Sequence, residues 1–196
     1  MALPSERPIL QELKVQVAIL LGLLALMWGI QLVNVTLFRG QLVGWGIHPR
    51  EAVGLRGIVF APWLHGSFNH LIANTIPFVT LGWLIMLQRT TDFLIVTAIA
   101  MGVSGLGTWL IGAANSVHVG ASGVIFGYLG YLLLRGYFER SLTAIVLSVV
   151  VLSVYGSLIW GVLPQQSGVS WEGHLFGLIG GGAARLLAQR ATEPTD

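Results

Sequence analysis

Residues 118–130 read HVGASGVIFGYLG, in which a serine is set among glycines at the head of an apolar run. Glycine recurs here at Gly123, Gly127 and Gly130, a spacing of four and three that puts all three on one face of a helix. A second series follows later in the chain, at Gly173, Gly177 and Gly181. Because small residues let helix backbones approach closely in lipid, the two series predict a pair of tightly packed helices.

The composition favours a membrane protein. The 196 residues are 55% hydrophobic and 9% charged, with a mean hydropathy of +0.80, whereas a soluble domain carries about 25% charged residues. The net charge of +2 comes without a basic cluster, which argues against a nucleic-acid partner. The absence of cysteine excludes disulfides, thiol catalysis and cysteine-ligated metals.

Six apolar segments are long enough, or suitably placed, to cross a hydrocarbon core about 30 Å thick. They are residues 15–38, 68–87, 93–111, 121–134, 142–160 and 173–187. The fourth and sixth are short and rich in glycine, as expected of interior helices that pack closely against their neighbours. The sequence therefore predicts an all-α membrane protein, a bundle of six transmembrane helices that occupies residues 15–187.

The connection formed by residues 39–66 predicts a semi-submerged first loop. It is too apolar for a water-exposed loop, and glycine and proline interrupt it too often for a membrane span. These properties favour a partly helical segment that lies in the outer leaflet.

The placement of lysine and arginine predicts the orientation. With both termini in the cytoplasm, seven of the ten basic residues face inward. The first segment counts as a span, because its apolar stretch exceeds the about 7 to 15 residues of a signal peptide and no convincing cleavage site follows. The prediction is a multi-pass protein of the cell membrane, plasma or inner, with residues 1–14 and 188–196 as short cytoplasmic tails.

Polar side chains gather at one predicted depth. The second, fourth and sixth segments all run from outside to inside, and their outer ends carry His70 with Asn74, then Ser122, then His174. Taken singly, Ser122 is explained as a helix cap and each histidine as a structural group. Their coincidence at one depth favours a shared site, because polar groups inside a membrane are costly and tend to be functional.

This set of residue types is suited to acyl transfer. Ser122 becomes a nucleophile when a base such as His174 takes its proton. Among the eight acids only Glu172 lies near His174 in sequence, but it points to another side of the helix and lies at the rim, so a dyad is favoured over a triad. His70 and Asn74 share a helical face and are expected to donate to an oxyanion, together with the Ser122 N–H; Asn74 is the stronger assignment.

The other histidine patterns carry less information. His65 and His118 lie in outer connections, where a hydrogen bond to backbone or water is the ordinary explanation. Zinc could in principle bind His65, His70 and His174, but no carboxylate or cysteine ligand accompanies them. No metal and no cofactor are therefore expected.

Three stretches together resemble the rhomboid intramembrane serine proteases. They are HGSFNHLIAN at residues 65–74, GASG at residues 120–123 and GHLFGLIGG at residues 173–181. The resemblance covers most of residues 15–187, and the combination is specific although each piece alone is weak. It implies a six-span rhomboid-like fold with a semi-submerged first loop.

The resemblance also implies a role for each matching residue. These are Ser122 as nucleophile, His174 as general base, His70 and Asn74 as oxyanion donors, and Gly120 and Gly123 as the glycines that flank the serine. His65 matches an additional histidine that usually has a structural role. Phe126 stands where many members have a tyrosine, and it implies a ring that stacks on His174 without a hydroxyl group.

A protease of this kind is implied to cleave single-span membrane proteins in the lipid bilayer, within or beside their transmembrane helix. Two alternatives remain open from the residues. One is a catalytically silent relative that binds membrane clients, against which the presence of both Ser122 and His174 argues. The other is a histidine-lined transporter for a metal ion or small solute, which lacks an intramembrane acid to help carry a cation.

Overall fold

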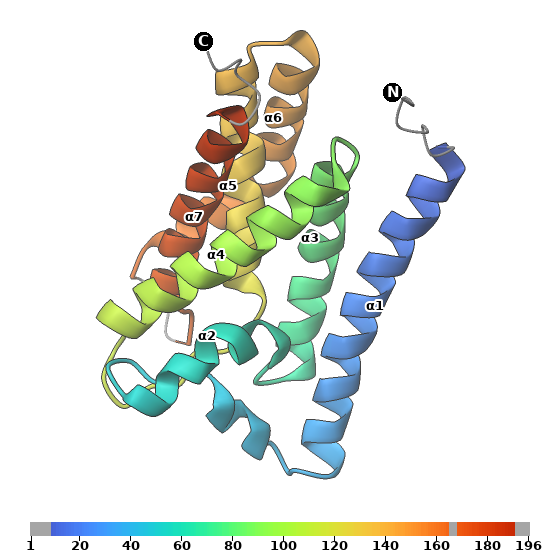
Figure 1. Cartoon of the computed structure of the whole chain (residues 1–196). Helices are drawn as coiled ribbons and strands as arrows, with labels where there is room; N and C mark the ends of the chain where they lie inside the picture. The colour runs from blue at the N-terminus through green and yellow to red at the C-terminus, as the bar shows by residue number, and fades with distance from the viewer. Residues whose placement is uncertain (1–8, 165–167, 191–196) are drawn as a thin grey trace, which may run out of the picture.

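The structure, a computed structural model, describes residues 9–164 and 168–190 (Figure 1). The described residues form helices, and the one β-type pairing among them is an isolated bridge. The α-helices are α1 (Ile9–Thr36), α2 (Gly57–Phe60), α3 (Phe68–Met86), α4 (Thr90–Ile111), α5 (Ser122–Glu139), α6 (Leu142–Tyr155) and α7 (Trp171–Arg190). Short 3₁₀ segments occupy Gln41–Trp45, Ala52–Arg56, Ala61–Trp63 and Gly156–Val162. The predicted all-α class is confirmed.

Each of the six predicted segments coincides with a helix, but these helices differ in apolar character. In the described part of the chain, four elements are long and apolar enough to cross a membrane: α1, α3, α4 and Leu142–Val162, which joins α6 to the 3₁₀ segment after it. The glycine-rich helices α5 and α7 are not among them. Most of α5 is buried, and α7 packs on both α4 and α5 (Figure 1).

The contact between α5 and α7 is made by backbone atoms. Gly177 lies against the backbone of Gly123, and Gly181 lies against the backbone of Gly127. A Cβ atom at either α7 position would overlap the facing carbonyl group, so glycine is what permits this approach. The pair of tightly packed helices that the glycine spacing predicts is confirmed.

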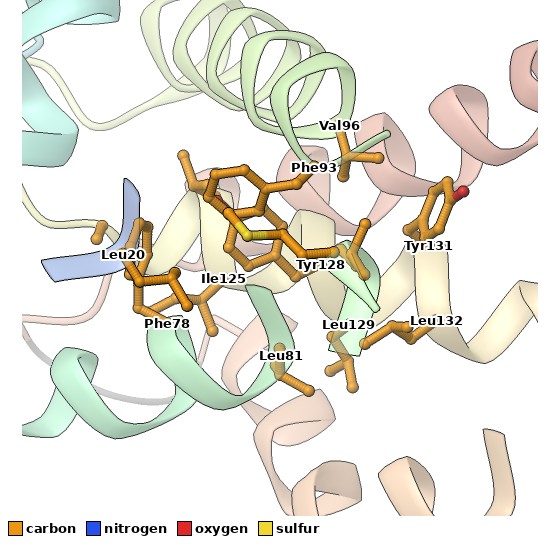
Figure 2. Packing of buried hydrophobic residues seen from close by; sticks show 14 of the residues in the cluster. Leu20, Phe78, Leu81, Phe93, Val96, Ile125, Tyr128, Leu129, Tyr131 and Leu132 are labelled. Atoms are coloured by element: carbon orange, nitrogen blue, oxygen red, sulfur yellow. The ribbon is translucent and has the colours of Figure 1, made fainter. Parts of the chain in front are cut away.

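A hydrophobic core fills the space between α3, α4 and α5 (Figure 2). Tyr128 of α5 lies between two other rings, with centroid distances of 5.6 Å to Phe78 of α3 and 5.4 Å to Phe93 of α4. Leu20 of α1 belongs to the same cluster. The buried Tyr128 hydroxyl forms a hydrogen bond of 2.7 Å with Thr97 Oγ1. This core holds α5 from the side opposite to α7.

The first loop, between α1 and α3, supports the chain just ahead of α5. It contains α2 and three of the 3₁₀ segments. Ile47 forms an antiparallel bridge with His118, and the Ala61 carbonyl accepts a hydrogen bond of 2.8 Å from the Gly120 N–H. The segment before Ser122 is therefore braced on two sides by the first loop. The depth of this loop in a membrane stays a prediction.

The N-terminal ends of α3, α5 and α7 lie at the same end of the bundle as the first loop, whereas α1 begins at the opposite end (Figure 1). The predicted tails, residues 1–14 and 188–196, lie mostly outside the described residues. Residues 9–14 belong to α1, which begins ahead of the predicted apolar segment, and the charged side chains of Glu12 and Lys14 in this first part of the helix are exposed. The side of the membrane that each terminus faces stays a prediction.

Replacing Gly181 with alanine is expected to destabilise the protein, because the added Cβ must displace the Gly127 carbonyl. Overpacking of a filled contact costs about 1–3 kcal/mol. The matched control is Gly102→Ala on α4, where nothing lies within 4 Å of the added atom. Thermal unfolding in detergent should show a lowered midpoint for Gly181→Ala only. Equal midpoints for the two variants would contradict the backbone contact between α5 and α7.

Candidate functional site

The α3 pair, His70 and Asn74, faces the chain just ahead of α5. A Cβ atom at Gly120 would lie 2.6 Å from His70 Cε1, 2.7 Å from His70 Nε2 and 3.4 Å from Asn74 Nδ2. Gly120 also has a φ of +118°, in the region that favours glycine. Ser67 fixes the start of α3, because its side chain accepts a hydrogen bond of 3.1 Å from the His70 N–H. The predicted convergence of α3 on the serine-bearing loop is therefore observed.

The Asn74 amide is buried but incompletely bonded. Asn74 is 7% exposed, and its Nδ2 atom has no hydrogen-bond partner among the described residues. Leaving a buried donor unpaired costs about 1–3 kcal/mol. An oxygen atom bound beside Gly120 would therefore gain a hydrogen bond from a donor that is already desolvated.

Ser122 is the first residue of α5. Ala121 occupies the N-cap position and no side chain caps this helix, so the explanation of Ser122 as a cap is wrong. The residue is half-buried and adjoins a small cavity. The N–H groups of Ser122 and Gly123 belong to the first helical turn, where backbone donors have no acceptor within the helix. The hydroxyl therefore stands beside backbone donors at the positive end of α5.

His174 lies in the first turn of α7, and its ring is held at one nitrogen and one face. Nδ1 is 2.9 Å from the carbonyl oxygen of Gly161. Because a carbonyl group only accepts, this bond assigns the proton to Nδ1 and leaves Nε2 as the basic nitrogen. Phe126 of α5 stacks on the ring, with centroids 4.1 Å apart and planes inclined by 8°. This is the stacking that the resemblance implies for Phe126.

The packing of α5 on α7 brings Ser122 and His174 to one end of the bundle. The Gly173 carbonyl is 3.3 Å from the position that a Cβ atom at Gly123 would take, and Ser104 of α4 donates to the same carbonyl at 2.8 Å. Among the described residues, no hydrogen bond joins the Ser122 hydroxyl to the His174 ring. Catalytic hydrogen bonds are often long in unliganded proteins and shorten when substrate binds.

A cavity of about 30 Å³ adjoins Ser122. Its polar lining comes from α4, α5 and two loops: Ser104, Thr108, His118, Ser122 and Ser170. This volume suits about one water molecule, and the surrounding hydroxyl groups supply hydrogen-bond partners for it. The fold thus keeps a polar, water-sized space next to the half-buried Ser122.

His65 is fully buried beside His70, and the two ring centroids are 5.1 Å apart in an edge-to-face arrangement. Neither ring nitrogen of His65 has a hydrogen-bond partner of normal geometry among the described residues. Burial and the neighbouring His70 lower the pKa of His65 from 6.5 to about 4. Among residues 9–164 and 168–190, no group of three or more His, Asp or Glu side chains is placed to hold a metal ion.

Glu172 does not orient His174. The sequence places this acid at the rim, but the residue is only 5% exposed. It lies near His118 instead: burial lowers the pKa of His118, and the Glu172 carboxylate opposes that shift. The position that an orienting acid would take at His174 Nδ1 is occupied by the Gly161 carbonyl. Residue types could not have revealed this partner, because every residue carries a backbone carbonyl.

Comparisons with known proteins find similar sequences. A family model described as Rhomboid domain matches residues 52–190. An uncharacterized protein of Mycobacterium leprae is 42% identical over 184 residues, which cover 90% of this chain and 72% of that protein. An uncharacterized protein of Mycobacterium tuberculosis is 47% identical over 150 residues, which cover 72% of this chain and 62% of that protein. The chain thus spans less than two thirds of the length of the latter relative.

A third relative has a name that refers to an activity. YdcA of Bacillus subtilis, which its name describes as a candidate rhomboid protease, is 28% identical over 183 residues. These residues cover 90% of each of the two chains.

Lowering the pH is expected to destabilise the protein through His65. Between pH 6.5 and about pH 4 the unfolded chain binds a proton at this residue and the folded chain does not, so stability falls as the pH falls through that window. His65→Leu removes the titrating group and should make the thermal midpoint in detergent less dependent on pH over the same range. Parallel profiles for the variant and the wild type would contradict the burial of a neutral imidazole.

Proposed function

The chain belongs to the rhomboid family, and from this premise we propose that it is a serine endopeptidase that cleaves transmembrane segments of single-span membrane proteins. Family membership and several apolar helices make the protein membrane-embedded. The observation that carries the proposal is the state of His174, whose Nδ1 donates to the Gly161 carbonyl while its ring stacks on Phe126. These contacts present the basic Nε2 on the helix that packs against α5.

In the proposed reaction, Ser122 and His174 act as a dyad. His174 Nε2 takes the proton of Ser122 Oγ as that oxygen attacks the scissile carbonyl carbon. The imidazolium then gives the proton to the leaving nitrogen, the C–N bond breaks, and an ester on Ser122 remains. A water molecule, deprotonated by the same nitrogen, hydrolyses the ester. The Gly161 carbonyl stabilises the imidazolium throughout, a task that an aspartate performs in a triad.

The developing oxyanion is proposed to lie between α3 and the start of α5. Asn74 Nδ2, the His70 ring and the Ser122 N–H are the donors on that side, and the positive end of α5 adds to their effect. Each such donor lowers the barrier by about 3 kcal/mol when it is aimed at the oxyanion in advance. The unpaired, buried amide of Asn74 supports its assignment, because its desolvation is complete before substrate arrives.

The proposal includes the setting in the membrane. We assign six spans to residues 15–187, with α5 and α7 crossing inside a shell formed by the four apolar helices, and cytoplasmic termini in a plasma or inner membrane. The first loop then lies at the outer surface, where it covers the cavity beside Ser122 through Ile47 and Ala61. Water from that surface supplies hydrolysis, and no cofactor is needed.

Ser122→Ala and His174→Ala are each expected to abolish cleavage of a single-span substrate while the protein still folds. The measurement is turnover of a panel of single-span proteins in detergent or proteoliposomes, with labelling by a fluorophosphonate probe. Ser153→Ala, at an exposed serine of α6 that bonds only to its own helix, is the matched control. Undiminished turnover in either site variant would refute the dyad. An unlabelled wild type would favour the silent, client-binding relative instead.

Asn74→Ala is expected to lower kcat by about 100-fold to 1000-fold and to leave KM nearly unchanged, since the amide is proposed to contact the oxyanion only in the transition state. Asn69→Ala is the matched control, because Asn69 is exposed on the same helix. Steady-state kinetics on one cleavable substrate give both constants. A rise in KM with an unchanged kcat would assign Asn74 to substrate binding instead.

A further inference from the structure

His118 has a hydrogen-bond partner at each ring nitrogen. Nε2 is 2.7 Å from Ser116 Oγ, and Nδ1 is 2.7 Å from Ser170 Oγ. The Ser116 hydroxyl donates its single proton to the Ala113 carbonyl at 2.6 Å, so towards His118 it can only accept. The proton of the neutral ring is therefore on Nε2, and Nδ1 accepts the proton of Ser170. The network assigns one direction to every bond.

The Ser170 bond connects the two halves of the candidate site. His118 lies four residues before Ser122, and Ser170 lies four residues before His174. The Ser170 carbonyl accepts the His174 N–H at 3.1 Å, so Ser170 belongs to the turn that begins α7. Among the described residues, this is the one side-chain hydrogen bond between the loop before α5 and the loop before α7.

The backbone of His118 is held as firmly as its ring. Its N–H donates to the Ile47 carbonyl at 3.0 Å, and its carbonyl accepts from the Ile47 N–H at 2.9 Å. Gly46 lies so close to the His118 carbonyl that a Cβ atom there would be 2.5 Å from the oxygen. The position of His118 is therefore fixed relative to the first loop, and the bond from Ser170 to His118 holds the start of α7 at a set distance from it.

We propose that His118 is a positioning residue that sets the separation of Ser122 from His174 through its bond to Ser170. The inference rests on the proposed function, because a separation matters for the reaction only if these two residues perform it. His118 makes no contact with substrate in this proposal. Displacement of a reacting group by about 1 Å costs on the order of 100-fold in rate, so a single bond that fixes the separation affects kcat more than binding.

Two replacements of His118 separate its two bonds. Asparagine puts an oxygen near the place of Nδ1 and keeps an acceptor for Ser170, whereas glutamine puts an amide nitrogen near the place of Nε2 and keeps only the bond to Ser116. Both remove the ring, so a merely structural loss would be similar in the two variants. We expect His118→Asn to retain most of the wild-type kcat and His118→Gln to lose about 10-fold to 100-fold, with KM within about twofold in both.

Ser170→Ala tests the same bond from its other end. It should lower kcat as much as His118→Gln does, and the double variant should be no slower than either single one, because the two changes remove one interaction. The rate constant of fluorophosphonate labelling should follow the same order, since labelling needs the dyad but no substrate. Ser170→Ala removes one hydroxyl group from a half-buried site, so it carries the test if a His118 variant does not fold.

The outcomes distinguish this inference from the proposed function. Equal losses in His118→Asn and His118→Gln, or additive losses in the double variant, would overturn the positioning role. Wild-type turnover in all these variants would overturn it too and would leave the dyad intact. A wild-type protein that neither cleaves a single-span protein nor reacts with the probe would overturn both. The expected order, with a lowered kcat at constant KM, supports both.

Discussion

The close backbone approach of α5 and α7 is the constraint on which the rest of the structure depends. In lipid the hydrophobic effect does not drive helices together, so association rests on van der Waals contact and on hydrogen bonds. Gly123 and Gly127 on one helix meet Gly177 and Gly181 on the other, and side chains larger than hydrogen would separate the two axes. Because Ser122 and His174 lie at the N-terminal ends of these glycine rows, the same contact holds the fold together and brings the two residues to one end of the bundle.

Most polar groups inside the bundle are paired by hydrogen bonds, with few exceptions among the described residues. Ser104 donates to the Gly173 carbonyl, and Tyr131 donates to the Asp92 carboxylate at 3.0 Å, so each bond also joins two helices. Burying a polar group without a partner is costly, which explains why most are paired. Of the exceptions in the described chain, two lie against the site: the Asn74 amide and the His65 ring. In the proposed reaction, the unpaired Asn74 amide is available to the oxyanion, where negative charge develops.

The sequence predicts the helices well, because they depend on residue type. Apolar runs locate the helices, and glycine spacing identifies the α5–α7 contact. Polar residues at one predicted depth single out Ser122, His174 and Asn74, whose roles in a site stay a prediction. Contacts made by backbone atoms were not predictable in this way, and the Gly161 carbonyl is the main example. The predicted exposure of Glu172 at the rim was wrong, because periodicity predicts the face of a helix but not how far a neighbouring loop covers the end of that helix.

Because Gly161 lies outside the helices that carry Ser122 and His174, different parts of the molecule control the distance between these residues and the protonation of the His174 ring. The distance between Ser122 and His174 depends on the packing of α5 on α7 and on the loops ahead of these helices, whereas the proton on His174 Nδ1 is held by the Gly161 carbonyl, in the 3₁₀ segment that follows α6. The element Leu142–Val162 is the least enclosed of the four apolar ones, with 11% of the residues buried in an apolar stretch of 18 residues. A sequence change on this exposed element can therefore alter the basicity of the His174 ring while the spacing of α5 and α7 stays the same. In a bilayer these exposed side chains are expected to contact lipid, so the composition of the membrane is expected to influence the basicity of His174 as well.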